Sequence, residues 1–273
     1  MIKPEQFKFF SQLVKDSSGI ALSTGKEYLL ESRLNELCKV LGLKNIDSLY
    51  QQAKFKMTPK LKEQIIEAMT TNETYFFRDQ HPFDTLKNHI IKELMEKNQS
   101  KKELRFWSAA ASTGQEAYSI AMIIQEHFPQ LANWKVEILG TDISRQAIEK
   151  AQAGRYTQVE VNRGLPVTML IKYFKQQGAF WIAQDKLKKL VHFKTFNLLN
   201  PFIGLGQFDC IFCRYVLIYF DQETKKKITD KLVKVLRPGG YLFFGATETP
   251  VGLDPSMKRV TFGKTVCWKK AGG

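Results

Sequence analysis

The 273-residue sequence has only four cysteines and no long hydrophobic run. The cysteines, Cys38, Cys210, Cys213 and Cys267, are too few and too scattered for the disulfide framework of a small secreted protein. No apolar run approaches the roughly 20 residues that a membrane-spanning helix needs. The first residues also lack the apolar core and cleavage site of a secretory signal. We therefore expect a cytoplasmic protein with no membrane span.

Clusters of metal ligands are also lacking. Cys210 and Cys213 form a CxxC pair, but no second CxxC or histidine pair completes a set of four zinc ligands. Both cysteines fall in the apolar run Phe208–Cys213, which predicts a buried strand. We expect these thiols to lie in the core, and we predict no metal site.

Acidic residues are fewer than basic ones, and the net charge is +14. A charge of this size makes nucleic acid one candidate partner. The longest run of like charge, however, is only the three lysines at 225–227. Positive charge spread in this way suits an acidic protein partner at least as well as a phosphate backbone.

The first 70 residues follow a helical pattern throughout. Apolar residues recur at helical spacing, for example Leu30, Leu34 and Leu37. We predict an all-helical N-terminal domain over residues 1–70 and a linker over residues 71–80.

From residue 81 onwards, apolar strand-like runs alternate with helical patterns. The runs cover residues 104–107, 136–140, 191–196, 208–213 and 241–244. This alternation predicts an α/β domain over residues 81–273 with a doubly wound, mostly parallel sheet. The glycine and lysine at 263–264 separate two further strand-like segments, which predicts a terminal β-hairpin.

Residues 154–190 are too long for a simple connection between a helix and a strand. The segments 179–183 and 187–191 flank a polar turn at 184–186. We predict an inserted antiparallel β-subdomain in which these two segments pair.

A turn of small residues at 108–114 joins the first apolar run to a helix that begins near Gln115. A strand, a small-residue turn and a helix N-terminus together form a typical cradle for a nucleotide-like ligand. The turn has a single glycine, Gly114, whereas the fingerprint for a pyrophosphate has three. It therefore favours a ligand without a diphosphate, such as S-adenosylmethionine.

Polar residues near the ends of the predicted strands are candidates to contact this ligand. Asp142 is placed to accept hydrogen bonds from ribose hydroxyls, although it or Ser144 is also a candidate N-cap of the next helix. Glu116 is placed to pair with the ligand's ammonium group, although acidic residues favour helix N-termini in any case. Asn197 offers a donor and an acceptor to an adenine edge.

Three more candidates, Arg214, Tyr215 and Tyr219, follow the run Phe208–Cys213 at the carboxyl end of a predicted strand. Each alone is equally typical of an ordinary loop. Their convergence with the other candidates on one edge of the sheet is what predicts a site. Arg78 and the aromatic residues before it lie upstream, where a cover over this site is expected.

Five stretches closely resemble the CheR-type chemoreceptor methyltransferases. They are Thr-Asn-Glu-Thr-Tyr-Phe-Phe-Arg at 71–78, Trp-Ser-Ala-Ala-Ala-Ser-Thr-Gly-Gln-Glu-Ala-Tyr-Ser at 107–119, Thr-Asp-Ile at 141–143, Asn-Leu at 197–198 and Cys-Arg-Tyr-Val-Leu-Ile-Tyr-Phe-Asp at 213–221. The similarity runs in the same order from about Phe7 to Lys269. It implies a class I methyltransferase-like fold and the transfer of a methyl group from S-adenosylmethionine to receptor glutamates. The products would be glutamyl methyl esters and S-adenosylhomocysteine, and the partners the cytoplasmic methylation helices of chemoreceptors.

The resemblance also implies roles for individual residues. The expected cofactor-binding residues, to which we add Ala110 and Gly114 of the small-residue turn, are Asn72, Thr74, Arg78, Ala110, Gly114, Glu116, Asp142, Asn197, Leu198, Arg214 and Tyr215. Arg78 and Tyr219 align with the residues nearest the transferred methyl group and are the expected catalytic residues. The sequence departs from the family at Tyr215, where Asn is usual, and a phenol cannot reproduce the paired donor and acceptor of an amide.

The chemistry implied by the resemblance needs no dedicated base, because a glutamate with a pKa of about 4.3 is already ionised at neutral pH. Alignment and exclusion of water matter more, and we expect Arg78 to orient the carboxylate and Tyr219 to donate a hydrogen bond. Lys26, Arg33 and Lys39 lie beside an apolar stripe and are the expected receptor-facing residues, although a solvated helix face explains them equally well.

Two alternatives remain open. A nucleic-acid methyltransferase is favoured by the isoelectric point of about 9.5, but the sequence after residue 213 lacks the Asn/Asp-Pro-Pro-aromatic motif of enzymes that methylate bases. A non-catalytic, S-adenosylmethionine-binding regulatory module is the second, because Tyr215 departs from the family pattern.

Overall fold

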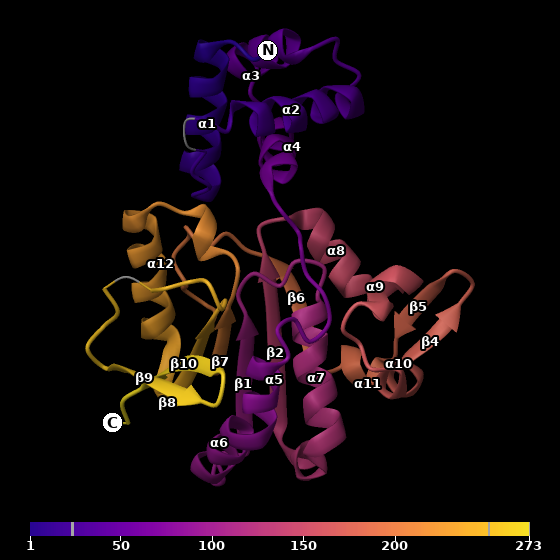
Figure 1. The fold of residues 1–273 in the computed structure, drawn as a ribbon, viewed down its shortest axis with the longest axis vertical. Helices are drawn as coiled ribbons and strands as arrows, with labels where there is room; N and C mark the ends of the chain where they lie inside the picture. Colours follow the sequence, from indigo (N-terminus) through magenta and orange to yellow (C-terminus); the bar gives the residue numbers. More distant parts are fainter. Residues whose placement is uncertain (23–24, 251, 273) are drawn as a thin grey trace. The chain divides into compact units, whose positions relative to one another are not determined.

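The computed structural model describes residues 1–22, 25–250 and 252–272. Its contacts divide the chain into two compact units, both drawn in Figure 1. The first unit comprises Met1–Thr71 and the short segment Tyr219–Thr224, and the second comprises Asn72–Ile218 and the chain from Lys225 onwards. No helix among the described residues is both long enough and apolar enough to span a membrane.

The first unit is helical, as predicted. It contains α1 (Pro4–Ser18), α2 (Glu27–Leu41), α3 (Ile46–Phe55) and α4 (Pro59–Met69). Apolar residues at helical spacing, including Phe10, Leu34 and Ile65, are fully buried in a common core. The segment Tyr219–Thr224 joins this unit through an isolated bridge between Ile20 and Phe220.

A seven-stranded sheet of order β6-β2-β1-β7-β8-β10-β9 forms the centre of the second unit. Its strands are β1 (Glu103–Ser108), β2 (Lys135–Asp142), β6 (Val191–Thr195), β7 (Phe208–Cys213), β8 (Leu236–Phe244), β9 (Met257–Phe262) and β10 (Thr265–Lys270). The first five strands in this order are parallel, whereas β10 is antiparallel to both β8 and β9. This confirms the doubly wound, mostly parallel sheet.

Helices complete this unit. After α4 and outside the insertion they are α5 (His81–Thr85), the π-helical turn η1 (Leu86–Ile90), α6 (Ile91–Lys97), α7 (Gln115–His127), η2 (Pro129–Asn133), α8 (Arg145–Ala153), η3 (Leu217–Tyr219) and α12 (Gln222–Val235). The last residue of η3 and the first three residues of α12 belong to the segment Tyr219–Thr224 of the first unit. Buried side chains of β1 and α7, such as Phe106 and Ile120, share one core cluster. Trp107, the next residue of β1, stacks instead on Phe208, because successive side chains of a strand point to opposite faces.

All six residues of β7 are buried, as expected for a strand of a parallel sheet that is covered on both faces. Cys210 and Cys213 are therefore core residues, as predicted. Burial raises the pKa of both thiols well above the ordinary value, so they stay protonated at neutral pH.

The insertion forms a separate three-stranded antiparallel sheet of order β3-β5-β4, made of β3 (Arg155–Thr157), β4 (Phe174–Gln177) and β5 (Phe180–Ala183). Its short helices are α9 (Gln158–Asn162), α10 (Val167–Tyr173) and α11 (Asp185–Lys188). The insertion packs against α7 through α11 (Figure 1).

The pairing predicted within the insertion is wrong in one respect. β5 pairs with β4, which precedes it, and not with the segment at 187–191. Gly178, at φ 57°, supplies the left-handed conformation that the tight turn between them needs. The polar turn at 184–186 instead leads into α11, and Val191 already pairs with Ile138 in the main sheet.

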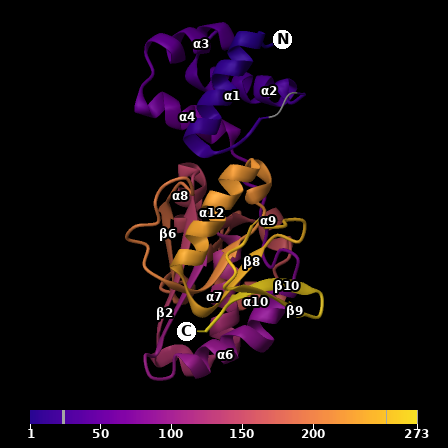
Figure 2. The same ribbon diagram turned by 90° about the vertical axis from the view of Figure 1, so that its left-hand side faces the viewer.

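The predicted terminal hairpin is confirmed. β9 and β10 pair in antiparallel register, with Thr265 opposite Phe262 across the turn at Gly263 and Lys264. The hairpin supplies the last two strands at one end of the main sheet, as can be followed in Figure 2.

Candidate cofactor and methyl-transfer site

The carboxyl ends of β1, β2, β6 and β7 meet at one edge of the sheet, because these strands are parallel neighbours. Ligands of open α/β sheets bind at this edge. Asp142 is the last residue of β2, and the loops that follow the other three strands carry Gly114, Asn197 and Arg214. The fold thus gathers the predicted candidates from four separate parts of the sequence.

The turn after β1 has a tightly constrained backbone. Ser112 has a φ of 48°, and Gly114, at the N-terminus of α7, has a φ of 96°. A Cβ at Gly114 would lie 2.9 Å from the Cβ of Ala151 and 3.0 Å from the ring of Phe193. The single glycine of the turn is therefore required by its backbone conformation and by its packing against α8 and β6.

Asp142 ends β2 and links two loops. Its buried carboxylate accepts hydrogen bonds from the backbone N–H of Ser112 (2.8 Å) and of Ser144 (2.9 Å). Ser144 itself is the N-cap of α8, accepting from the N–H of Ala147 at 3.0 Å. The two backbone donors fix the orientation of the carboxylate at the position where a ribose is bound in open α/β folds.

The start of the linker lies against these two loops. The carbonyl of Asn72 accepts from the hydroxyl of Ser112 at 2.9 Å, and its amide donates to the hydroxyl of Ser144 at 3.4 Å. Thr74 follows in the same segment and is partly exposed, as is Ala110 in the turn after β1. Hydrogen bonds therefore hold this part of the linker beside the end of β2.

A buried charge network extends from α7 to the linker. Glu116 accepts from the hydroxyl of Ser108 (2.7 Å) and from Nη1 of Arg214 (2.9 Å). Nη2 of Arg214 pairs with the carboxylate of Asp79 at 2.5 Å and donates to the carbonyl of Arg78 at 2.9 Å. The Arg214 side chain is only 2% exposed, and burial of such a charge is tolerated because carboxylates on both sides compensate it.

Tyr215 connects this network to the side chain of Arg78. Its hydroxyl donates to the Asp79 carboxylate, and its ring centre lies 3.8 Å from Cζ of Arg78. Nη1 of Arg78 also donates to the carbonyl of Glu73 at 2.7 Å. Burial and the bond to Asp79 raise the pKa of Tyr215, so its hydroxyl is a donor at neutral pH. The guanidinium of Arg78 is thus stacked on a fixed ring.

Sequence reasoning missed two carboxylates of this site, Asp79 and Glu248. Glu248 accepts from the backbone N–H groups of Tyr215 (2.6 Å), Gly245 (2.8 Å) and Ile218 (3.2 Å), and so joins the loops after β7 and β8. The only feature of the sequence that could have marked Asp79 as a site residue is its position directly after Arg78. Glu248 closes a stretch, Gly-Ala-Thr-Glu at 245–248, for which the sequence alone suggested no role.

Strained backbone conformations gather at the same place. Six non-glycine residues among those described have a positive φ, and five of them are Phe77, Asp79, Gln80, Ser112 and Tyr215. Each such conformation costs free energy and persists only where the surrounding contacts impose it. Their concentration in the linker and in the loops after β1 and β7 is typical of a functional site.

The loop after β6 is also held in place. Oδ1 of Asn197 accepts from the N–H of Leu199 at 2.9 Å, and Leu198 is buried. Nζ of Lys231, on α12, donates to the carbonyls of Leu198 (2.5 Å) and Leu199 (3.0 Å). The predicted adenine contact therefore belongs to a loop with a defined conformation.

Four predicted residues lie in the first unit. The carbonyl of Tyr219 accepts from the N–H of Ala21 at 2.8 Å. Arg33 donates to carbonyls at the end of α4, including that of Thr70 at 3.0 Å. Lys39 pairs with Glu36 on the surface, and Lys26 is exposed. The Arg33 side chain therefore stabilises the end of α4, whereas the side chains of Lys26 and Lys39 lie on the surface.

The polar groups at the edge of the sheet fit S-adenosylmethionine. Asp142 suits a ribose, and Glu116 can accept from an ammonium group because a carboxylate has about four acceptor positions. Nε of Arg214 is buried and has no hydrogen-bond partner among the described residues. It is a donor of the kind that the ligand's carboxylate would satisfy.

Comparisons with known proteins identify the family of both parts of the chain. The family model described as "CheR methyltransferase, SAM binding domain" matches residues 72–266, and "CheR methyltransferase, all-alpha domain" matches residues 5–70. The chain is 42% identical to the chemotaxis protein methyltransferase Cher2 of Pseudomonas putida over 94% of its own length and 93% of the relative's. It is 41% identical to chemotaxis protein methyltransferase 1 of Pseudomonas aeruginosa over 89% of both chains.

A third relative, the chemotaxis protein methyltransferase of Vibrio parahaemolyticus, is 36% identical over 98% of both chains. The matches extend over the helical domain and the cofactor domain alike, which confirms the resemblance noted in the sequence. The chain therefore belongs to the CheR family of S-adenosylmethionine-dependent chemotaxis methyltransferases.

Proposed function

We propose that this protein methylates the side-chain carboxylates of specific glutamates on chemoreceptors, giving glutamyl methyl esters and S-adenosylhomocysteine. The observation that supports this most is the arrangement around Arg78. Its guanidinium is stacked on Tyr215, which is joined through Asp79 to the buried Arg214. A cation held in this way beside the cofactor edge is suited to orient an anionic acceptor.

We assign cofactor binding to the residues that surround the carboxyl ends of β1, β2, β6 and β7. They are Asn72, Thr74, Arg78, Ala110, Gly114, Glu116, Asp142, Asn197, Leu198, Arg214 and Tyr215. S-Adenosylmethionine, when bound, supplies a methyl group carried on a positively charged sulfur. The carboxylates of Asp142 and Glu116 would fix its two ends, and the buried network around Arg214 would exclude water from the space between them.

Arg78 has the task of positioning the acceptor. A glutamate side chain is ionised at neutral pH and needs no base. Arg78 is stacked on a ring and bound to one carbonyl, so it keeps a donor edge for a carboxylate without a buried counter-ion of its own. Tyr219 would donate a hydrogen bond near the same carboxylate.

We propose that the helical domain, residues 1–70, recognises the receptor. Residues 71–80 are the proposed linker, and residues 81–273 are the proposed methyltransferase domain. Among the basic candidates, Lys26 and Lys39 are exposed on the surface. They are better placed to meet an acidic methylation helix than Arg33, whose guanidinium binds carbonyls at the end of α4.

The proposed function is tested by transfer of a labelled methyl group from S-adenosylmethionine to cytoplasmic receptor fragments, with DNA and RNA as parallel acceptors. We expect label in the receptor fragment that is released as methanol by mild base, and a loss of at least about tenfold in Arg78→Ala, the size of effect of one lost orienting contact. Label in nucleic acid would contradict the proposal. Cofactor binding by calorimetry without transfer to any acceptor would instead indicate a regulatory module.

A further inference from the structure

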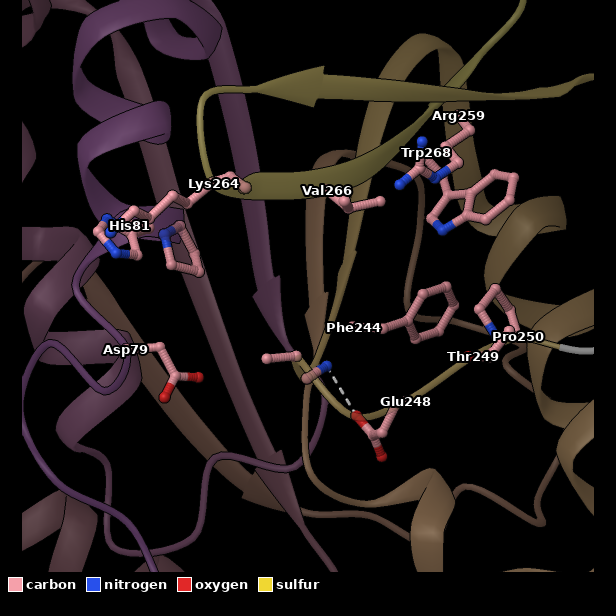
Figure 3. A pocket seen from close by; sticks show the side chains of 14 residues that line it. Asp79, His81, Phe244, Glu248, Thr249, Pro250, Arg259, Lys264, Val266 and Trp268 are labelled. Carbon is pink, nitrogen blue, oxygen red and sulfur yellow. Dashed lines mark hydrogen bonds between the residues drawn. The ribbon is translucent and has the colours of Figure 1, made fainter.

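A cavity of about 300 Å³ lies within the second unit, and Asp79 of the candidate cofactor site is part of its lining. Figure 3 shows its lining, which comes from the loop after β8, from the β9–β10 hairpin and from the start of α5. Phe244 and Trp268 form apolar walls, and Arg259 lies next to Trp268, its cross-strand neighbour. This volume suits a single side chain or a small ligand.

The acidic residues in the lining already have hydrogen-bond partners outside the basic residues of the cavity. Asp79 is paired with Arg214 and accepts from the hydroxyl of Tyr215. Glu248 accepts from three backbone N–H groups, among them that of Tyr215 at 2.6 Å. Neither carboxylate is paired with a basic residue of the cavity.

The basic residues in the lining have no such partners. The side chains of His81, Arg259 and Lys264 make no hydrogen bond or ion pair with any residue that the structure describes. Figure 3 shows Lys264 and His81 at one side of the cavity and Arg259 at the other. The cavity therefore has two basic side chains without a paired carboxylate, together with a histidine and apolar walls. This lining is complementary to an anionic group with an aliphatic stem.

The cavity is also continuous with the residues that hold Arg78. Asp79 and Glu248, in its lining, contact Tyr215, and the ring of Tyr215 stacks on Arg78. A Cβ at Gly245, also in the lining, would lie 3.0 Å from the Tyr215 ring. The cavity lining and Arg78 thus share contacts with one residue, Tyr215.

We propose that this cavity receives an acidic side chain that lies one helical turn from the acceptor glutamate on the receptor. The inference rests on the proposed function and deepens it, because it names a feature of the substrate that the enzyme selects. The Cβ atoms of residues three or four positions apart on a helix are separated by about 5–6 Å. Arg78 and the cavity are neighbouring sites of this kind, because Arg78 stacks on the Tyr215 ring and lining residues of the cavity contact Tyr215.

A segment of the receptor is a better occupant than a free anion. Arg259 and Lys264 are exposed, and exposed ion pairs contribute little by themselves, so a free carboxylate or phosphate would bind weakly. An acidic side chain on a helix already held at the acceptor site adds its contact at a high effective concentration. The negative charge of this neighbouring side chain then determines which receptor glutamates bind well enough to be methylated.

The test compares two receptor fragments, one with glutamate and one with glutamine a single turn from the methylated residue. The full-length wild-type protein, Arg259→Gln, Lys264→Gln and the double variant are assayed with both. With the acidic fragment we expect KM to rise about threefold to tenfold in the double variant, the effect of two exposed ion pairs. With the glutamine fragment the rise should shrink to less than about twofold, because the partner charge is gone.

The matched control is Lys258→Gln. Lys258 is exposed on the same strand, one residue from Arg259, and does not line the cavity. It should change KM for both fragments equally, if at all. Equal effects of Arg259→Gln and Lys258→Gln, or equal losses with both fragments, would show general surface attraction and overturn the proposal. Tight binding of free glutarate to the wild type but not to the double variant would indicate a small-anion site instead. If the wild type methylates neither fragment, the proposed function itself fails.

Discussion

At the scale of single residues, the proposed positioning of the acceptor depends on Tyr215. The residue has a φ of 58°, which is unusual for a bulky side chain, and it has two contacts of different kinds. Its hydroxyl binds Asp79 and its ring stacks on Arg78. This chain therefore holds its arginine by an aromatic ring.

The two contacts of Tyr215 are separable by mutation. Tyr215→Phe removes only the hydrogen bond to Asp79 and should lower the free energy of unfolding by about 1 kcal/mol, with a small effect on activity. Tyr215→Asn tolerates the positive φ but removes the ring over Arg78, a cation–π contact of about 1–2 kcal/mol. We expect it to lower kcat/KM by about tenfold. Denaturant unfolding and steady-state kinetics check both values, and an equal loss of activity in the two variants would contradict the role given to the ring.

At the scale of elements, the turn after β1 has a conformation set by packing. Gly114 has a positive φ and no room for a side chain. It contrasts with Gly178 in the β4–β5 turn, which also has a positive φ but has no atom within 4 Å of the place that a Cβ would occupy. The two glycines thus separate the cost of backbone conformation from the cost of a steric clash.

We predict that Gly178→Ala costs about 1 kcal/mol of stability, from the backbone alone. Gly114→Ala should cost about 2–4 kcal/mol, because the new Cβ also collides with Ala151 and Phe193. It should weaken cofactor binding too, since the turn would shift. Urea unfolding of both variants measures the difference, and similar losses at the two positions would refute the packing argument.

The sequence pattern predicts elements better than it predicts contacts. The parallel strands follow from their apolar runs, and β7 is buried along its whole length as expected. The β4–β5 pairing was missed, because β4 has three exposed residues and little apolar pattern. Asp79 and Glu248 were missed for another reason. They act on Tyr215 and Arg214, which are far away in the sequence, and no local spacing records such contacts.

At the scale of the whole molecule, charges on neighbouring strands tie the main sheet together. Arg105 on β1 pairs with Glu137, directly opposite on β2, at 3.0 Å. Arg237 on β8 bridges Glu103 on β1 and the fully buried Asp209 on β7, at 2.5 and 2.8 Å. These pairs join four of the five parallel strands.

These pairs predict acid sensitivity. Hydrogen bonds from Arg105 and Arg237 lower the pKa values of Glu137 and Glu103 from their usual 4.5. A carboxylate with a lowered folded-state pKa stabilises the protein fully above the unfolded value and loses that contribution as pH falls through the folded one. Unfolding free energy should therefore drop below about pH 4.5. Glu137→Gln should flatten this drop, whereas Glu63→Gln on the exposed surface of α4 should leave it unchanged. A steeper drop in Glu137→Gln would contradict the assignment.

The molecule as a whole combines a helical domain and a cofactor domain of one methyltransferase family. The proposed function depends above all on the chemical group that is methylated. The most direct measurement is mass spectrometry of a chemoreceptor cytoplasmic fragment after incubation with this protein and S-adenosylmethionine. We predict the added mass of one methylene on glutamate side chains, removable by mild base and absent where those glutamates are changed to glutamine. A modification that survives base, or that maps to lysine, arginine or an added nucleic acid, would contradict the account.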